Sequence, residues 1–249
     1  REEEKLKETL ERILRELEKL AKENKELLER ILKRDEDLTR ENKETLDRLL
    51  KRVEEVTRRK EDDDRLREIL ERIKEEVDRD VRKNEKILKD IEDEVREAVK
   101  RNETRLREIK RKVEELVKDL REKLKDVDRA RRIVEELKKI IDKVLDDHRK
   151  MVRRLLEVIK KLLDLHRESV KKLKEVVKEL LDILREVRGD REVEKVLRDI
   201  KRKIKEIVDE HRDMNRKIKE EIDRIDTEYK KSLKDIKKEI EEVLDEARQ

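Results

Sequence analysis

The stretch that decides the fold is residues 6–20, LKETLERILRELEKL. Its apolar residues follow one another at steps of three or four positions: Leu6, Leu10, Ile13, Leu17 and Leu20. An α-helix has about 3.6 residues per turn, so these side chains lie on one face of a helix. The Glu, Lys and Arg residues between them then face water. The stretch therefore predicts an amphipathic helix.

The same apolar face continues through the chain as an 18-residue repeat. Equivalent positions are filled by Leu10, Leu28 and Leu46; by Leu70, Leu88, Leu106 and Leu124; by Leu137, Leu155 and Leu173; and by Ile200, Ile218 and Ile236. Five helical turns of about 3.6 residues make one repeat, so the face drifts neither left, as in a heptad, nor right, as in an 11-residue repeat. We expect straight, untwisted helices.

Three interruptions divide this pattern into four helices. They are residues 58–64 (RRKEDDD), which end in three Asp residues suited to cap a helix, the phase break at 125–129, and Gly189, the only glycine. The predicted helices span about 2–60, 64–124, 128–188 and 190–248. Short connections make consecutive helices antiparallel. The sequence thus predicts an all-α, single-chain antiparallel four-helix bundle that forms one domain over residues 1–249.

The composition excludes several classes of function. Of the 249 residues, 60% are charged, yet 77 Lys or Arg against 73 Asp or Glu leave a net charge of only +4. The chain has no Cys, so it forms neither a disulfide framework nor a thiolate metal site. It has no long apolar run, no basic stripe and no Phe or Trp, which argues against membrane and nucleic-acid partners. We expect a soluble monomer that requires no partner and is cytoplasmic on recombinant expression.

Eight polar residues occupy positions where the repeat favours an apolar side chain. Each helix has one pair, 18 residues apart: Asn24 and Asn42, Asn84 and Asn102, His148 and His166, and His211 and Tyr229. If each pair lies level with the pair of the next antiparallel helix, the turn lies midway between the paired residues. These midpoints fall at the three interruptions. The sequence therefore predicts two buried polar layers about 27 Å apart, at about 1.5 Å per residue. One layer comprises Asn42, Asn84, His166 and His211, and the other comprises Asn24, Asn102, His148 and Tyr229.

A structural role for these layers follows from the free energy of burying polar groups. An unpaired buried group costs about 1–3 kcal/mol, so we expect hydrogen bonds across each layer. A different register or connectivity would bury Asn or His against Leu, and the layers therefore specify register and topology. Five further residues either extend the networks or reach water at the edge of the core: Thr45, Asp80, Ser169, Asn215 and Asp226.

Together, the 18-residue repeat, the restricted alphabet, the minimal turns and the matched polar layers resemble de novo designed helical bundles. That family is built from parametric backbones with buried hydrogen-bond networks. The resemblance covers the entire chain and implies a very stable structure with no natural substrate. On this basis we expect a structural scaffold that is not an enzyme and has no catalytic residues and no cofactor.

Two other functions remain as alternatives from the sequence. In the first, protonation of neutral His148, His166 and His211 places charge in the apolar core, so the bundle loses stability in acid. The second is a metal site at His166 and His211, which share a layer and have Asp80 within a turn of it; we do not expect this site, because no histidine belongs to a Glu-x-x-His pair and the remaining members of that layer are Asn. The residues three positions before the histidines are Leu145, Leu163 and Val208.

The third predicted helix has a wider apolar arc than the others. The residues on its edge are Val158, Leu165, Val176 and Ile183. Two interpretations are open. Either this helix is more enclosed than a square bundle requires, or the edge pairs with another molecule, so that the chain self-associates.

Overall fold

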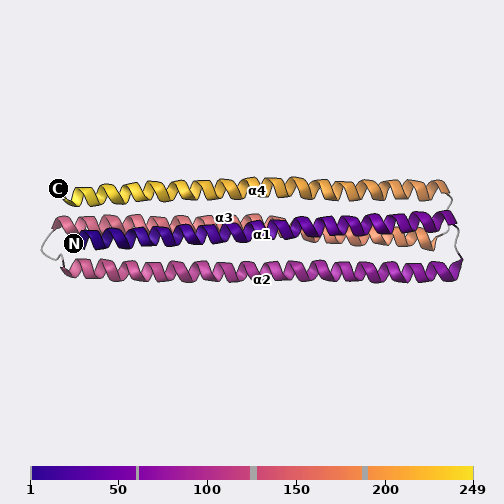
Figure 1. Ribbon diagram of the computed structural model, residues 1–249, viewed down its shortest axis with the longest axis horizontal. Coiled ribbons are helices and arrows are strands. Elements are labelled where there is room, and N and C mark those ends of the chain that lie inside the picture. Colours follow the sequence, from indigo (N-terminus) through magenta and orange to yellow (C-terminus); the bar gives the residue numbers. More distant parts are fainter. Residues whose placement is uncertain (1, 60–61, 124–127, 187–189, 249) are drawn as a thin grey trace. The chain divides into compact units, whose positions relative to one another are not determined.

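The computed structural model describes residues 2–59, 62–123, 128–186 and 190–248. These residues form four long helices, α1 (Glu2–Arg59), α2 (Asp63–Lys123), α3 (Asp128–Arg185) and α4 (Asp190–Arg248), which Figure 1 shows in chain order from indigo to yellow. The predicted fold class, an all-α four-helix bundle, is confirmed. The third helix ends at Arg185 rather than near residue 188. Gly189, which we predicted to end it, lies outside the described residues.

The start of α2 shows how the acidic run begins a helix. The Asp62 carboxylate accepts a hydrogen bond from the Arg65 backbone N–H at 3.0 Å. The backbone carbonyl of the same residue accepts the first helical bond, from the Leu66 N–H, at 3.0 Å. Asp62 is therefore the N-cap of α2, and it satisfies a backbone donor that the helix itself leaves unpaired.

The chain divides into two compact units, and each unit contains one segment of every helix. The first comprises Arg1–Glu29, Asp93–Val158 and Glu220–Gln249, and the second comprises Arg30–Glu92 and Ile159–Lys219. Within the second unit, Asn42 pairs with Asn84 and Arg52 pairs with Glu76, so residue numbers rise along α1 as they fall along α2. These segments are antiparallel. The single domain that the sequence predicts over residues 1–249 stays a prediction.

The core of each unit is built from the apolar face of the repeat, but the four helices contribute unequally. Among the described residues, α1 and α3 each contribute 17 buried hydrophobic residues, whereas α2 and α4 each contribute 11. The wider arc of α3 fits this arrangement, because Val158, Val176 and Ile183 are buried within the chain and Leu165 is half-buried. The first of the two interpretations, a more enclosed helix, therefore accounts for three of the four edge residues.

Charged side chains cover the outward faces and form ion pairs between neighbouring helices. In the second unit, Lys83 donates to Glu41 at 2.6 Å. In the first, Arg154 donates to Glu228 at 2.5 Å. Exposed pairs of this kind contribute about 0–1 kcal/mol each, so the stability of the fold comes mainly from the buried apolar faces. None of the helices, as far as the structure describes them, has a stretch long and apolar enough to cross a membrane.

Candidate functional site

In the first unit, four polar residues form one hydrogen-bonded chain that joins all four helices. We call Asn24, Asn102, His148 and Tyr229 the Tyr module. The Asn24 and Asn102 amides bond reciprocally at 2.9 and 3.0 Å. His148 Nε2 lies 3.0 Å from Asn102 Oδ1, and His148 Nδ1 lies 2.6 Å from the Tyr229 hydroxyl. The rings of His148 and Tyr229 meet edge to face, with centroids 5.3 Å apart.

The direction of each bond in the Tyr module follows from one backbone carbonyl. Asn102 Nδ2 donates to the Ala98 carbonyl at 2.7 Å, so Asn102 Oδ1 faces His148 as an acceptor. His148 Nε2 must therefore be the protonated nitrogen, and Nδ1 accepts from the Tyr229 O–H. This arrangement uses both ring nitrogens of a neutral imidazole.

Burial sets the ionisation of the Tyr module. His148 is 0% exposed. Its burial disfavours the imidazolium and lowers the pKa of His148 to about 4. Burial, together with the nearby carboxylates of Asp147 and Glu18, raises the pKa of Tyr229 far above its ordinary value. The Tyr module is therefore uncharged near neutral pH.

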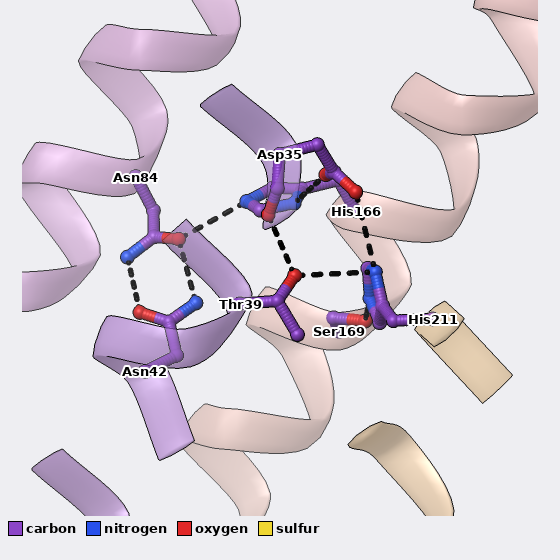
Figure 2. A network of polar contacts seen from close by, with 7 residues as sticks. All are labelled: Asp35, Thr39, Asn42, Asn84, His166, Ser169 and His211. Carbon is purple, nitrogen blue, oxygen red and sulfur yellow. Dashed lines mark hydrogen bonds and ion pairs between the residues drawn. The ribbon is translucent and has the colours of Figure 1, made fainter. Parts of the chain in front are cut away.

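The second unit holds a larger polar cluster, which Figure 2 shows from close by. We call it the Asp module; its members are Asp35, Thr39, Asn42, Asn84, His166, Ser169 and His211. As in the Tyr module, the Asn42 and Asn84 amides bond reciprocally, at 2.9 Å each. His166 Nε2 lies 3.1 Å from Asn84 Oδ1. On the other side of the ring, Nδ1 lies 2.7 Å from Asp35 Oδ1, which links α3 directly to α1.

Both ring nitrogens of His166 face acceptors. Asn84 Nδ2 donates to the Asp80 backbone carbonyl at 2.7 Å, which fixes Asn84 Oδ1 as the acceptor toward His166. The other partner, Asp35, is a carboxylate. Burial by itself would raise the pKa of Asp35, but its contacts with His166 and His211 outweigh burial and lower that pKa to about 2. Asn84 Oδ1 and the Asp35 carboxylate thus offer acceptors to the two ring nitrogens of His166, on opposite sides of the ring.

His211 completes the Asp module from α4. Its Nδ1 lies 3.4 Å from Thr39 Oγ1 and 3.6 Å from Asp35 Oδ2. The Thr39 hydroxyl donates to the Asp35 backbone carbonyl at 2.8 Å, so its oxygen can only accept from His211. His211 Nδ1 is therefore a donor, and Nε2 meets the Ser169 hydroxyl. Asp35 Oδ2 is buried and makes no hydrogen bond.

The structure places the sequence-derived candidates as follows. Asn24, Asn102, His148 and Tyr229 lie together in the first unit, and Asn42, Asn84, His166 and His211 lie together in the second. Of the possible extensions, Ser169 contacts His211.

Among the described residues, the side chains of the other four possible extensions form no hydrogen bond or ion pair with either module, and only the Asp80 backbone carbonyl contacts one, by accepting from Asn84. Thr45 accepts from Arg48 at 3.5 Å. Asp226 forms ion pairs with Lys25 and Lys230, at 3.4 and 3.0 Å. The buried oxygens Asp80 Oδ2 and Asn215 Oδ1 have no hydrogen-bond partner. The side chains of these four residues therefore do not extend either network.

Sequence reasoning missed Asp35 and Thr39. The repeat contains a signal for Asp35, because the positions 18 residues before and after it are Leu17 and Val53, both 0% exposed. A carboxylate at that position is an exception of the same kind as the Asn and His residues. Thr39 has a weaker signal, since its equivalents are Ala21 and Thr57.

The two modules differ in what they can do chemically. Both ring nitrogens of His148 and the proton of the Tyr229 hydroxyl are engaged within the Tyr module, so neither residue has a proton or a ring-nitrogen lone pair left for a substrate. In the Asp module, ligand atoms of Asp35, His166 and His211 all lie within 4.8 Å of one another, and all three residues are buried. Two imidazoles and a carboxylate are a donor set that divalent transition metals bind.

Comparison with known proteins adds little to this description. No protein-family model matches the chain, and no curated protein matches it. One solved structure with similarity is described as a computationally designed three helix bundle. It is 18% identical, the match covers 98% of this chain and 91% of that chain, and the TM-score is 0.39. A TM-score this low does not establish a common fold, so the four-helix assignment rests on the helices and contacts described above.

Proposed function

We propose that the chain is a designed helical bundle whose function is structural: a scaffold in which two buried polar modules specify register and connectivity. The observation that supports this most strongly is that each module includes residues from all four helices. The two modules also repeat the same Asn, Asn and His series at an offset of 18 residues, from Asn24, Asn102 and His148 to Asn42, Asn84 and His166.

The Tyr module would penalise a misplaced helix. If α4 moved by one turn along its neighbours, Tyr229 would leave His148 Nδ1 without a donor, and an apolar residue would take its place. Each polar group left unpaired costs about 1–3 kcal/mol. An apolar core of the same shape would tolerate such a shift, because leucines can pack against one another in several registers.

The test is to replace the polar core residues of both modules by Leu: Asn24, Asp35, Asn42, Asn84, Asn102, His148, His166, His211 and Tyr229. We expect the free energy of unfolding to stay similar or rise, because buried polar groups have been exchanged for apolar ones. We also expect the single state to be lost, seen as more than one set of amide NMR resonances or a mixture of masses by light scattering. A control chain with Leu106→Met and Leu145→Met keeps both modules and alters only packing. An all-Leu variant with one set of resonances and one mass would contradict the proposal.

A scaffold with a pH-dependent transition is a second candidate, supported by the surroundings of His148. The groups that face its ring from the other helices are the Tyr229 hydroxyl and the Asn102 amide, both neutral. Nearby charges, from Asp147 and Glu18, act on Tyr229. A proton added to His148 would remove the acceptor for the Tyr229 hydroxyl and place a charge in the core. We infer that His148 is the residue through which acid would weaken the bundle.

A further inference from the structure

We propose that Asp35, His166 and His211 form a binding site for one divalent transition-metal ion of the Zn²⁺ class. This inference is independent of the scaffold role. It rests on three buried donor residues from three helices of the second unit, and on a carboxylate oxygen, Asp35 Oδ2, that is buried without a hydrogen-bond partner.

The positions of the donor atoms are close to those that a metal requires. In a tetrahedral Zn²⁺ site, metal–ligand bonds of about 2.0–2.2 Å place the ligand atoms about 3.3 Å apart. His166 Nδ1 and Asp35 Oδ1 are 2.7 Å apart, and His211 Nδ1 and Asp35 Oδ2 are 3.6 Å apart. The first separation is shorter than the distance that a tetrahedral site requires, and the second is longer. All three ligand atoms lie within 4.8 Å of one another, so side-chain rotations that shorten the longest separation by at most about 1.5 Å would bring both imidazoles and the carboxylate onto one ion.

Both imidazoles also have the outer partner that metal-bound histidines need. A histidine that binds metal through one nitrogen donates its other N–H to a fixed acceptor, which orients the ring. For His166 this acceptor is Asn84 Oδ1, at 3.1 Å from Nε2, and it is held in place by the bond from Asn84 to the Asp80 carbonyl. For His211 the acceptor is the Ser169 hydroxyl oxygen, which contacts Nε2. Each ring is thus oriented with Nδ1 toward Asp35 (Figure 2).

A fourth ligand and a route of entry are also present. The Thr39 hydroxyl gives its hydrogen to the Asp35 backbone carbonyl, so its oxygen lone pairs point toward His211 Nδ1, 3.4 Å away. A groove of about 550 Å³ is lined by residues of α1 and α4, among them Thr39, His211 and Asn215. Water or an ion can therefore reach the edge of the Asp module from solvent.

Proton balance follows from the hydrogen bonds. On binding, His166 releases its Nδ1 proton to solvent and keeps the Nε2 proton toward Asn84. His211 moves its proton from Nδ1 to Nε2, toward Ser169. The ion then gives the buried carboxylate of Asp35 a cationic partner.

The Tyr module provides an internal control. It has the same Asn, Asn and His series, but the partner of its histidine is a hydroxyl that donates, and it contains a single imidazole and no carboxylate. Its donor set does not suit Zn²⁺. A metal that binds through the proposed site will therefore leave His148 unaffected.

The experiment is a titration of the full chain, first treated with a chelator, with Co²⁺ and then Zn²⁺. We expect the visible absorption of tetrahedral Co²⁺ to saturate at one ion per chain and to disappear when Zn²⁺ displaces it. We expect Asp35→Asn and His211→Gln to abolish the absorption, Ser169→Ala to weaken binding by about 10- to 100-fold, and His148→Gln to leave it unchanged. Circular dichroism of each variant reports whether its helices are intact.

A measurement on the unaltered chain keeps the test independent of how well the variants fold. Ring ¹⁵N NMR should show Zn²⁺ shifting the Nδ1 resonances of His166 and His211 and leaving those of His148 in place. Three results would overturn the proposal: no saturation at one equivalent, weak octahedral absorption typical of surface carboxylates, or equal shifts at all three histidines.

Discussion

At the scale of single residues, what faces histidine Nδ1 distinguishes the two modules. Tyr229 donates to His148, whereas Asp35 accepts from His166. The same Asn, Asn and His series thus ends at a hydroxyl in one unit and at a carboxylate in the other. One side chain decides whether Nδ1 of the buried imidazole accepts or donates, because a hydroxyl can donate and an ionised carboxylate can only accept.

The Tyr229 hydroxyl should stabilise the first unit through His148 alone. We expect Tyr229→Phe to lower the free energy of unfolding by about 1–3 kcal/mol, because His148 Nδ1 is then buried without a donor. The measurement is denaturant unfolding. In a chain that already has His148→Leu, the same substitution should cost much less. Equal costs in the two backgrounds would show that the bond to His148 contributes nothing.

Acid should weaken the bundle through His148. Because the pKa of His148 falls from 6.5 when unfolded to about 4 when folded, the unfolded chain binds more protons between these values. Stability is therefore full above about pH 6.5, falls as the pH decreases, and levels off below about pH 4, with a loss of about 3 kcal/mol at about 1.4 kcal/mol per pKa unit. Unfolding of the chain and of His148→Gln at several pH values checks this. Identical pH profiles would contradict it.

At the scale of helices, the caps at the helix ends and the buried apolar faces contribute separately to the free energy of unfolding, and each contribution can be measured. Asp62 caps α2 by accepting from the Arg65 N–H. We expect Asp62→Ala to lower the free energy of unfolding by about 1 kcal/mol and Asp62→Asn to preserve it, because both Asp and Asn accept this bond. Asp64→Ala is the matched control, since Asp64 is exposed within the first turn. An equal cost for Asp64→Ala would contradict the capping role.

The enclosed face of α3 gives a second prediction for a helix. Leu180 is 0% exposed in the core of the second unit, and its neighbour Leu181 is partly buried against the same core. We expect Leu180→Ala to cost about 2–5 kcal/mol, since it leaves a cavity, and Leu181→Ala to cost about 1 kcal/mol or less. Thermal or denaturant unfolding of the two variants checks the difference. A similar cost for both would show that this face of α3 is not enclosed as described.

At the scale of the whole molecule, every helix contributes a segment to each compact unit. Helix formation is cooperative, so we expect the two units to unfold in one transition and to behave as the single predicted domain. Ring NMR signals of His148 and His166 report on the first and second unit respectively. Denaturant midpoints that coincide would support one domain. Two separate midpoints would show that each unit is a domain of its own.

Most of the fold could be predicted from the sequence because its determinants are local. The 18-residue repeat, the acidic run and the phase breaks act over a few turns of helix, and they located four helices whose described ends lie within three residues of the predicted ones. That the helices are straight and untwisted stays a prediction. The unequal numbers of buried hydrophobic residues in the four helices could be predicted only in part, because the sequence indicated a wide apolar arc for α3 and not for α1.

By itself, the sequence determined which positions face the core and most of the polar residues among them, because helical periodicity converts spacing into direction. Which of these polar side chains bond to one another was decided only by the tertiary structure. The proton positions of His166 depend on Asn84 on one side and Asp35 on the other, and these residues come from different helices. Asp35 itself went unnoticed because an Asp among many charged residues stands out only when its equivalents, Leu17 and Val53, are seen to be buried. Hydrogen bonds are directional and short, so their pairing is fixed by packing geometry that spacing along one helix does not contain.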